Sequence, residues 1–271
     1  MNKIEFKKQP LFAMGDIHGH FDILLEFIIK NGFKDCCIIV AGDIGMGFMK
    51  KEEYIKLFNS FNPIFEKYGI TLLFVRGNHD DPKYFNNDIL SFSNIKFVKD
   101  YTVIKIGNEN ILCIGGAISI DRKRRIAKMM CEKSLLIFNH KGDLTVEEAN
   151  NLITQRYWKD EIPIFDKDAI EEIDENIDYV VTHTSPSFCF KQSRESIESW
   201  IENDDKLNND LDAERKTLDD IYNALIKKFN IKKWIYGHFH EHHNEKINNI
   251  EFITLDKDRD NVIDCIEVNH I

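Results

Sequence analysis

The chain has 271 residues, of which 43% are hydrophobic and 30% charged, and its formal net charge is −10. This size and hydrophobic content predict one α/β domain, with two small domains as the alternative. The acidic charge argues against extended contact with duplex nucleic acid, which requires a basic face, although it leaves room for a local basic pocket.

Neither a membrane span nor a secretory signal is expected. No apolar stretch approaches the roughly 20 residues that a transmembrane helix needs, and Met1–Pro10 contains lysines but no apolar core. The six cysteines form no C-x-x-C pair, and several lie in apolar runs, as buried free thiols do. This cysteine pattern predicts a reducing compartment, and we therefore expect a cytoplasmic protein.

Short apolar runs alternate with helical patterns in the first half of the chain. Strands are predicted over Leu11–Met14, Cys37–Ala41 and Leu72–Val75, and helices over Phe21–Asn31 and about Lys51–Tyr68. Pro63 is expected to kink or split the second helix, because proline lacks a backbone N–H. Continuous apolar strands that alternate with helices are typical of parallel strands buried on both faces.

Further strands follow in the second half. A polar turn, Gly107–Asn110, separates two β-rich runs and predicts a hairpin of Tyr101–Ile106 with Ile111–Gly115. Later strands are predicted at Tyr179–Thr182 and Trp234–Tyr236, and a closing pair at Glu251–Leu255 and Val262–Val268. Two polar segments, about 121–166 and 187–212, interrupt this alternation. We interpret them as rim insertions in a single domain, 1–271, because functional loops concentrate at such places.

Five short motifs place metal-ligand residues directly after apolar runs. They read Gly15-Asp16-Ile17-His18-Gly19, Gly42-Asp43, Gly77-Asn78-His79-Asp80, Thr182-His183 and Gly237-His238-Phe239-His240. Ligands in an α/β sheet gather at the carboxyl ends of strands, so we expect these motifs to meet at one rim. Two Asp, one Asn and four His, with one His to spare, form a donor set for two divalent cations of intermediate hardness.

In this order the motifs resemble those of the calcineurin-like metallophosphoesterase superfamily, whose pattern reads D-x-H, G-D, G-N-H-[DE], H and G-H-x-H. The resemblance covers about residues 11 to 243. It implies a metallophosphoesterase-type four-layer α/β/β/α sandwich. It assigns one metal ion to Asp16, His18 and His240, assigns the other to Asn78, His183 and His238, and lets Asp43 bridge the two.

The resemblance also implies a mechanism. Two such ions bind a bridging hydroxide that attacks the phosphorus atom in line with the leaving group. His79 adjoins a ligand without being one, and imidazole suits proton transfer near neutral pH, so we assign it as general acid. Manganese and/or iron suit the mixed ligand set, with zinc or nickel as alternatives.

The chain departs from the serine/threonine phosphatases of this superfamily, which continue the second motif as G-D-x-V-D-R-G. Met46 stands where that branch has an Asp that orients the catalytic His, and Gly47 stands where it has a phosphate-binding Arg. Phosphate therefore needs other cations. Arg76, Arg122 and Arg125 are predicted to supply them, because an arginine fork grips two phosphate oxygens. The alternative for the last two is a solvated helix face.

Several other residues have open roles. Trp158 either packs the first insertion down, which we favour, or stacks on a substrate ring. Asp22 and Asp80 are candidates for helix capping, Asp22 the better one. His20, His242 and His243 are interpreted as solvated rim residues, and contact of His242 and His243 with the substrate is the alternative.

The sequence thus predicts a metal-dependent phosphoesterase that hydrolyses phosphomonoesters, on a phosphoprotein or a small phosphorylated molecule, away from membranes. The first alternative is a phosphodiesterase acting on cyclic nucleotides or nucleic-acid ends. A non-catalytic protein-binding scaffold on the same fold and a component of a nucleic-acid repair assembly are the remaining hypotheses.

Overall fold

The computed structural model describes residues 2–140, 144–189, 197–257 and 262–269. Its strands are β1 (Lys3–Phe6), β2 (Leu11–Met14), β3 (Cys36–Val40), β4 (Ile70–Phe74), β5 (Ile95–Phe97), β6 (Thr102–Ile106), β7 (Glu109–Ile114), β8 (Tyr179–Thr182), β9 (Lys233–Tyr236), β10 (His243–Ile247), β11 (Ile250–Thr254) and β12 (Cys265–Glu267). Its helices are α1 (Phe21–Lys30), α2 (Lys51–Tyr68), α3 (Lys83–Asn86), α4 (Arg122–Asn139), α5 (Val146–Leu152), α6 (Lys167–Glu171), α7 (Glu198–Asn203) and α8 (Leu207–Lys228).

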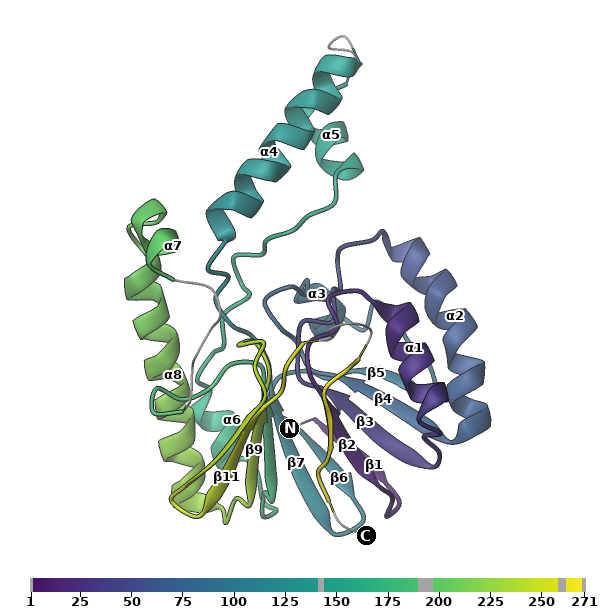
Figure 1. The fold of residues 1–271 in the computed structure, drawn as a ribbon, viewed down its shortest axis with the longest axis vertical. Helices are drawn as coiled ribbons and strands as arrows, with labels where there is room; N and C mark the ends of the chain where they lie inside the picture. The colour runs from purple at the N-terminus through teal and green to yellow at the C-terminus, as the bar shows by residue number, and fades with distance from the viewer. Residues whose placement is uncertain (1, 141–143, 190–196, 258–261, 270–271) are drawn as a thin grey trace.

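Two sheets pack face to face between outer helices. The larger sheet has the order β1-β6-β7-β8-β9-β11-β10, and the smaller one the order β12-β2-β3-β4-β5. Helices α1 and α2 cover the outer face of the smaller sheet, whereas α6 and α8 cover that of the larger sheet (Figure 1). The predicted four-layer α/β/β/α sandwich is therefore confirmed.

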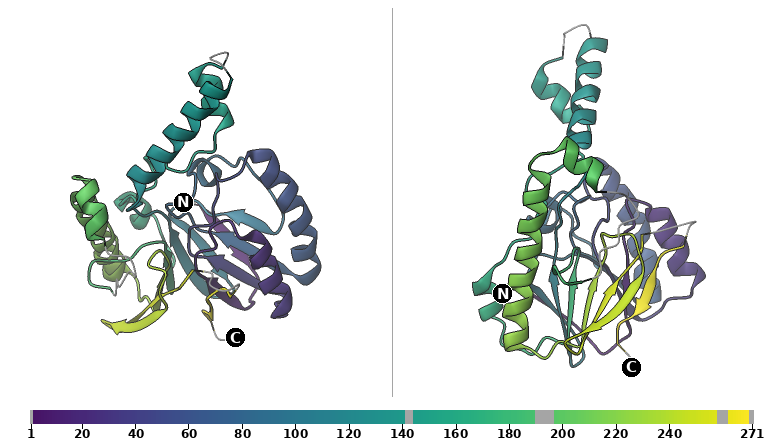
Figure 2. Two further views of the ribbon diagram at one scale, coloured as in Figure 1. Left: turned by 45° about the horizontal axis from the view of Figure 1, so that its top comes forward. Right: turned by 60° about the vertical axis from the view of Figure 1, so that its left-hand side comes forward.

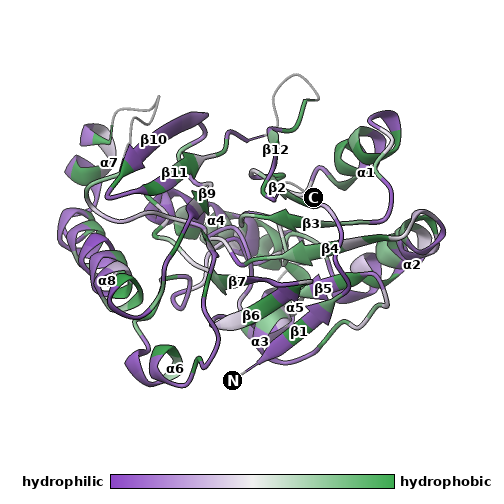
Figure 3. Ribbon diagram, turned by 90° about the horizontal axis from the view of Figure 1, so that it is seen from below, coloured by the Kyte–Doolittle hydropathy of each residue, from purple (hydrophilic) through white to green (hydrophobic). Residues whose placement is uncertain are grey.

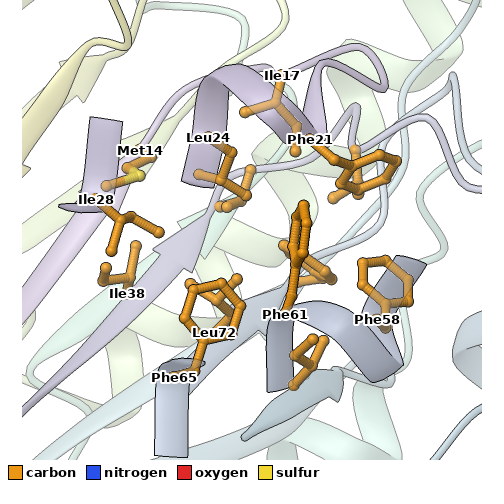
Figure 4. Packing of buried hydrophobic residues seen from close by; sticks show 14 of the residues in the cluster. Met14, Ile17, Phe21, Leu24, Ile28, Ile38, Phe58, Phe61, Phe65 and Leu72 are labelled. Carbon is orange, nitrogen blue, oxygen red and sulfur yellow. The ribbon is translucent and has the colours of Figure 1, made fainter. Parts of the chain in front are cut away.

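Three apolar clusters separate the four layers. Side chains from both sheets, among them Ile39, Leu73, Ile111 and Val181, form the central cluster. Phe21 and Leu24 of α1 and Phe58, Phe61 and Phe65 of α2 form an outer cluster with Ile38 and Leu72 of the smaller sheet (Figure 4). Burial on both faces explains why every residue of β3 and β4 is buried and all but Thr71 are apolar, whereas β10, at the edge of its sheet, is hydrophilic (Figure 3).

Parallel pairing brings the loops that carry the motifs to one edge. Strands β2, β3 and β4 run parallel to one another in the smaller sheet. Strands β7, β8 and β9 run parallel in the larger sheet. Within each sheet, the loops that follow β2, β3 and β4 or β8 and β9 therefore leave the carboxyl ends of their strands on one side, where ligands of α/β proteins bind, and side chains from the loops of both sheets meet there.

The structure corrects two predictions about secondary structure. Helix α2 runs from Lys51 to Tyr68 without a break, so Pro63 does not split it, and the buried face, which includes Phe61 and Phe65, packs on both sides of the proline. Asn59, whose carbonyl loses its helical partner there, lies at an exposed position where water can replace that partner. The predicted closing pair does not form either: β11 pairs with β9 and β10, whereas β12 pairs with β2 in the other sheet.

Helices α4 and α5 form a projection, here called the arm, that extends away from the sandwich (Figures 1 and 2). Helix α4 has no buried residue. The arm and the chain that returns from it to the sandwich make up the first predicted insertion. Within the described residues, no helix has both the length and the apolar character that a membrane crossing requires.

The second predicted insertion is only partly a rim segment. Residues 190–196 lie outside the described part of the chain, and α7 follows them. From Leu207 onward the segment belongs to α8, which packs Leu218, Ile221 and Leu225 against the larger sheet. This part is therefore a covering helix of the fold.

Candidate metal centre

The five motifs converge where the two sheets present the carboxyl ends of their strands. Ligand atoms of Asp16, His18, Asp43 and His240 lie within 4.8 Å of one another, and so do those of Asp43, His183 and His238. The amide oxygen Oδ1 of Asn78 lies 3.0 Å from Nε2 of His183. The structure thus brings together all seven predicted ligands in two groups that share Asp43.

The backbone is held in an uncommon conformation at four of these ligands. His18, Asp43, His238 and His240 have φ values of 45°, 50°, 70° and 53°. Residues other than glycine rarely adopt positive φ, and such conformations persist where the surrounding structure enforces them, often at functional sites. The surrounding structure therefore holds the backbone of these loops in the conformation that places the four side chains at the site.

Glycines allow these loops to approach one another closely. A Cβ atom on Gly42, whose φ is +100°, would lie 2.1 Å from Nδ1 of His183, and a Cβ on Gly77 would lie 2.2 Å from the backbone nitrogen of Asp43. Side chains at either position would push ligands apart, which explains the glycine in these motifs.

The charge of the site calls for cations. Asp16 and Asp43 are 0% and 1% exposed, and their ion-pair partners among the described residues are all histidines. Two buried carboxylates without lysine or arginine are costly unless metal ions or protons neutralise them. Burial opposes a charge on His183, but Asp43 and then Asp16 outweigh it and raise its pKa to about 10. The same demand for positive charge would be met by metal ions.

The imidazoles fit the role of metal ligands. Burial lowers the pKa of His18, and burial together with the charge of His183 holds the pKa of His238 well below its usual value. Both shifts favour the neutral ring, which is the form that binds metal. Nε2 of His18 faces Nε2 of His240 at 3.1 Å, and the latter lies 3.3 Å from Oδ2 of Asp16. Nitrogen and carboxylate oxygen atoms thus point at a common centre, and the donor set fits divalent ions.

His79 lies beside both groups of ligands. Its backbone N–H donates to Oδ1 of Asp43 over 2.8 Å, and its Nε2 lies 3.7 Å from Oδ2 of the same carboxylate. Phe48 packs edge-on against the ring. Burial holds the pKa of His79 well below its usual value, with Asp43 opposing this effect and Arg125 adding to it.

Of the three predicted phosphate-binding arginines, the structure places only Arg125 at the site. Its guanidinium Nη2 donates to Nε2 of His79, and its Nε lies 2.5 Å from Oδ1 of Asp121. Arg125 comes from the first turn of α4, so the root of the arm contributes directly to the centre. The His79 ring therefore has an arginine as its partner, where the serine/threonine phosphatases use an aspartate.

The structure contradicts the prediction for Arg76. This side chain is 3% exposed, and its terminal nitrogens donate to the Asp100 carboxylate at 2.9 Å and to the Glu161 carbonyl at 2.7 Å. Further backbone carbonyls surround it at 3.3–3.4 Å. The guanidinium therefore ties the loop before Gly77 to the chain that returns from the arm, and it is not available to a phosphate.

Arg122 is not available either. It pairs with Asp204 at 2.6 Å and with Asp210 at 2.7 Å, and these carboxylates raise its pKa above the ordinary value. Arg122 thus clamps α4 to the segment that leads into α8. The prediction that it binds phosphate finds no support in this position.

The other residues whose roles the sequence left open lie outside the groups of predicted ligands. Trp158 is 4% exposed and packs on Gly47, where a Cβ would lie 2.6 Å from the indole ring, so it anchors the segment behind the arm as favoured. Asp22 lies in the first turn of α1, two residues beyond the N-cap position at His20, so it does not cap the helix as predicted. His242 pairs with Asp264 at 2.7 Å on an exposed part of the rim.

Sequence reasoning missed residues that support the ligands. Asp80 is fully buried and accepts hydrogen bonds from the backbone N–H groups of Ile44, Gly45, Met46 and Gly77, so it holds the second and third motifs together. Its place in the G-N-H-D motif was a signal for this role. Arg215 of α8 donates to Oγ1 of Thr184 and stacks on the Phe239 ring at 4.9 Å, and no motif pointed to it.

Fold and site together define a candidate centre for two metal ions on an α/β/β/α sandwich. A family model of calcineurin-like phosphoesterases matches residues 10–242, and the chain belongs to this family. None of the curated proteins with which it was compared matches it.

Several solved structures are similar over most of the chain. A dimetal phosphatase from Danio rerio shares 12% identity over 92% of this chain and 86% of its own, with a TM-score of 0.47. The phosphopantetheinyl hydrolase from Mycobacterium tuberculosis shares 15% identity over 92% and 89%, with a TM-score of 0.40. A cold-active protein tyrosine phosphatase from a psychrophilic Shewanella shares 15% over 93% and 72%, with a TM-score of 0.35. At these values they carry no argument about the substrate of this chain.

Proposed function

We propose that this phosphoesterase hydrolyses phosphomonoesters, either on a phosphoprotein or on a small phosphorylated molecule. Asp16, His18 and His240 would hold one divalent ion, Asn78, His183 and His238 would hold the other, and Asp43 would serve both. When bound, the two cations supply neutralisation of phosphate charge and acidify a water molecule.

One observation carries the preference for monoesters: the guanidinium of Arg125 lies against the His79 ring beside ligands of both groups. A phosphomonoester is a dianion at neutral pH, whereas a diester is a monoanion. An arginine placed next to the metal ligands offers two N–H groups to the additional charged oxygen. A phosphodiester lacks this additional charged oxygen and would gain less from the arginine.

His79 and Arg125 would share the handling of the leaving group. Burial and Arg125 favour the neutral imidazole in the protein alone, with Nε2 accepting from the guanidinium. A phosphate dianion bound between the two side chains would favour the protonated ring, because opposite charges raise the pKa of histidine. His79 is then the general acid for the departing alkoxide.

The mixed imidazole, carboxylate and amide donors favour manganese and/or iron, with zinc or nickel as alternatives. We place the enzyme in the cytoplasm, because its cysteine pattern is typical of a reducing compartment. The complete ligand set argues against a non-catalytic scaffold.

The test compares a nitrophenyl phosphomonoester with the corresponding bis-ester, using metal-stripped protein reloaded with manganese. We expect the monoester to be preferred, and we expect His79→Gln to retain metal while slowing esters with poor leaving groups most. Preference for the bis-ester would replace this proposal with the phosphodiesterase. Equal loss on good and poor leaving groups would remove the general-acid role from His79.

A further inference from the structure

Asn78 is connected to two buried residues that no motif includes. Its amide Nδ2 donates to Oγ of Ser119 over 3.1 Å. The Ser119 hydroxyl donates to Oε2 of Glu161 over 2.6 Å, and its backbone N–H donates to Oε1 over 2.8 Å. Asn78, Ser119 and Glu161 are 2%, 1% and 2% exposed. These hydrogen bonds link Glu161 through Ser119 to Asn78, a predicted metal ligand.

The donor and acceptor roles in these hydrogen bonds determine whether the oxygen or the NH₂ group of the Asn78 amide faces the predicted metal site. A carboxylate only accepts hydrogen bonds, so Glu161 draws the hydroxyl hydrogen of Ser119 towards itself. The lone pairs that remain on Oγ can only accept, and they select the NH₂ group of Asn78. The amide oxygen, which is the atom that can bind a metal, is thereby turned towards His183. The oxygen and the NH₂ group of the amide are similar in size, so without these hydrogen bonds shape alone would not determine which of them faces His183.

The carboxylate is itself held in place. The backbone carbonyl of Glu161 accepts from Arg76 at 2.7 Å and from the N–H of Ala117 at 3.1 Å. Arg76 directly precedes Gly77 and Asn78, so Glu161 is fixed to the ligand loop by its backbone as well as by its side chain. Burial raises the pKa of Glu161, whereas the hydrogen bonds from the hydroxyl and the backbone N–H of Ser119 lower it, because both favour the ionised carboxylate.

We infer that Ser119 and Glu161 are positioning residues that present Oδ1 of Asn78 to the second metal ion. This inference rests on the proposed dinuclear site. Groups that orient metal ligands through hydrogen bonds typically change metal affinity by about 10-fold to 100-fold when they are removed. Both residues act through Asn78, so neither is assigned a contact with the substrate.

Manganese titration of metal-free protein tests this inference, with calorimetry giving the affinity and the number of ions bound. In Ser119→Ala and Glu161→Gln we expect the affinity for one ion to fall by about 10-fold to 100-fold while the other ion binds as in the wild type. Glu161→Gln retains the shape of the side chain, but its NH₂ group can donate to Oγ and reverse the donor and acceptor roles in these hydrogen bonds. Ser134→Ala, on the exposed face of α4, is the matched control.

A double-mutant cycle with Asn78→Ala separates positioning from a general loss of structure. If Ser119 acts through the amide, adding Ser119→Ala to Asn78→Ala should weaken manganese binding no further. Independent, additive losses would overturn the inference, and so would wild-type affinities for both ions in Ser119→Ala and Glu161→Gln. A wild-type protein that binds fewer than two ions would overturn it together with the proposed dinuclear site.

Discussion

At the scale of single residues, the site contains an arginine, Arg125, whose partner is a histidine ring. Arg125 lies against a histidine, whereas its neighbour Arg124 is 70% exposed and pairs with Asp121 at 3.0 Å. The two arginines are adjacent on α4, yet only Arg125 contacts His79 and the backbone carbonyl of Asn78. This contrast provides a substitution and its control within one helical turn.

We expect Arg125→Gln to lower kcat/KM for a phosphomonoester by about 100-fold, the loss typical when one charged donor to the transition state is removed. The loss on a bis-ester should be smaller, because the monoanion has one charged oxygen fewer. Arg124→Gln should leave both values within a factor of about two, as expected for an exposed pair. Steady-state kinetics of both variants on both esters measure this, and equal losses on the two esters would contradict the assignment.

At the scale of elements, prediction succeeded where local patterns decide the outcome. Strands β2 and β8 match the predicted bounds, because continuous apolar runs end at a motif glycine or histidine. Strands β1, β5 and β10 were missed, and each lies at the edge of a sheet, where short or polar sequences are tolerated. Pairing partners were harder to predict, since the strand pattern does not state which sheet a strand joins.

The site could be predicted in part for the same reason. Each ligand lies within a few residues of a strand end, so its motif is visible in the sequence. Ser119 and Glu161 meet across 42 positions of the chain, and Arg76 meets Glu161 across 85. Contacts at such separations depend on where the chain that returns from the arm lies in the folded protein. Because the partners of Arg76 are so distant in the sequence, its guanidinium was predicted to be free to bind substrate.

The segment that carries Trp158 should contribute to stability far more than the tip of the arm. Trp158 is 4% exposed, whereas Phe138 on α4 is 79% exposed. Trp158→Ala should lower the free energy of unfolding by about 3–5 kcal/mol, while Phe138→Ser should change it by no more than about 0.5 kcal/mol. Urea denaturation measures both. Equal effects of the two substitutions would show that the arm tip is packed in solution.

At the scale of the whole molecule, the metal centre joins the two sheets. The smaller sheet supplies Asp16, His18, Asp43 and Asn78, and the larger sheet supplies His183, His238 and His240. Bound ions would therefore stabilise the sandwich across its central layer. The acidic net charge of −10 adds to the benefit of bound cations.

Removal of metal should consequently lower the melting temperature. A ligand present at 100 times its Kd stabilises the folded state by about 2.7 kcal/mol, so chelation of two such ions would cost about twice that. Thermal unfolding with and without a chelator, followed by restoration with manganese, measures the effect. A melting temperature that is unchanged by chelation of verified metal-loaded protein would contradict this coupling.

The central claim is that Asp43 serves two metal ions, and metal content tests it most directly. Oδ1 of Asp43 lies 3.1 Å from Nε2 of His183, while Oδ2 lies 3.9 Å from Nδ1 of His18, so its two oxygens face the two groups of ligands. We would measure manganese per chain by mass spectrometry after reloading and desalting wild-type protein and Asp43→Asn. We expect two ions per chain in the wild type, and in the variant a loss of metal from both sites with no phosphatase activity. Two retained ions and unchanged turnover in Asp43→Asn would contradict it.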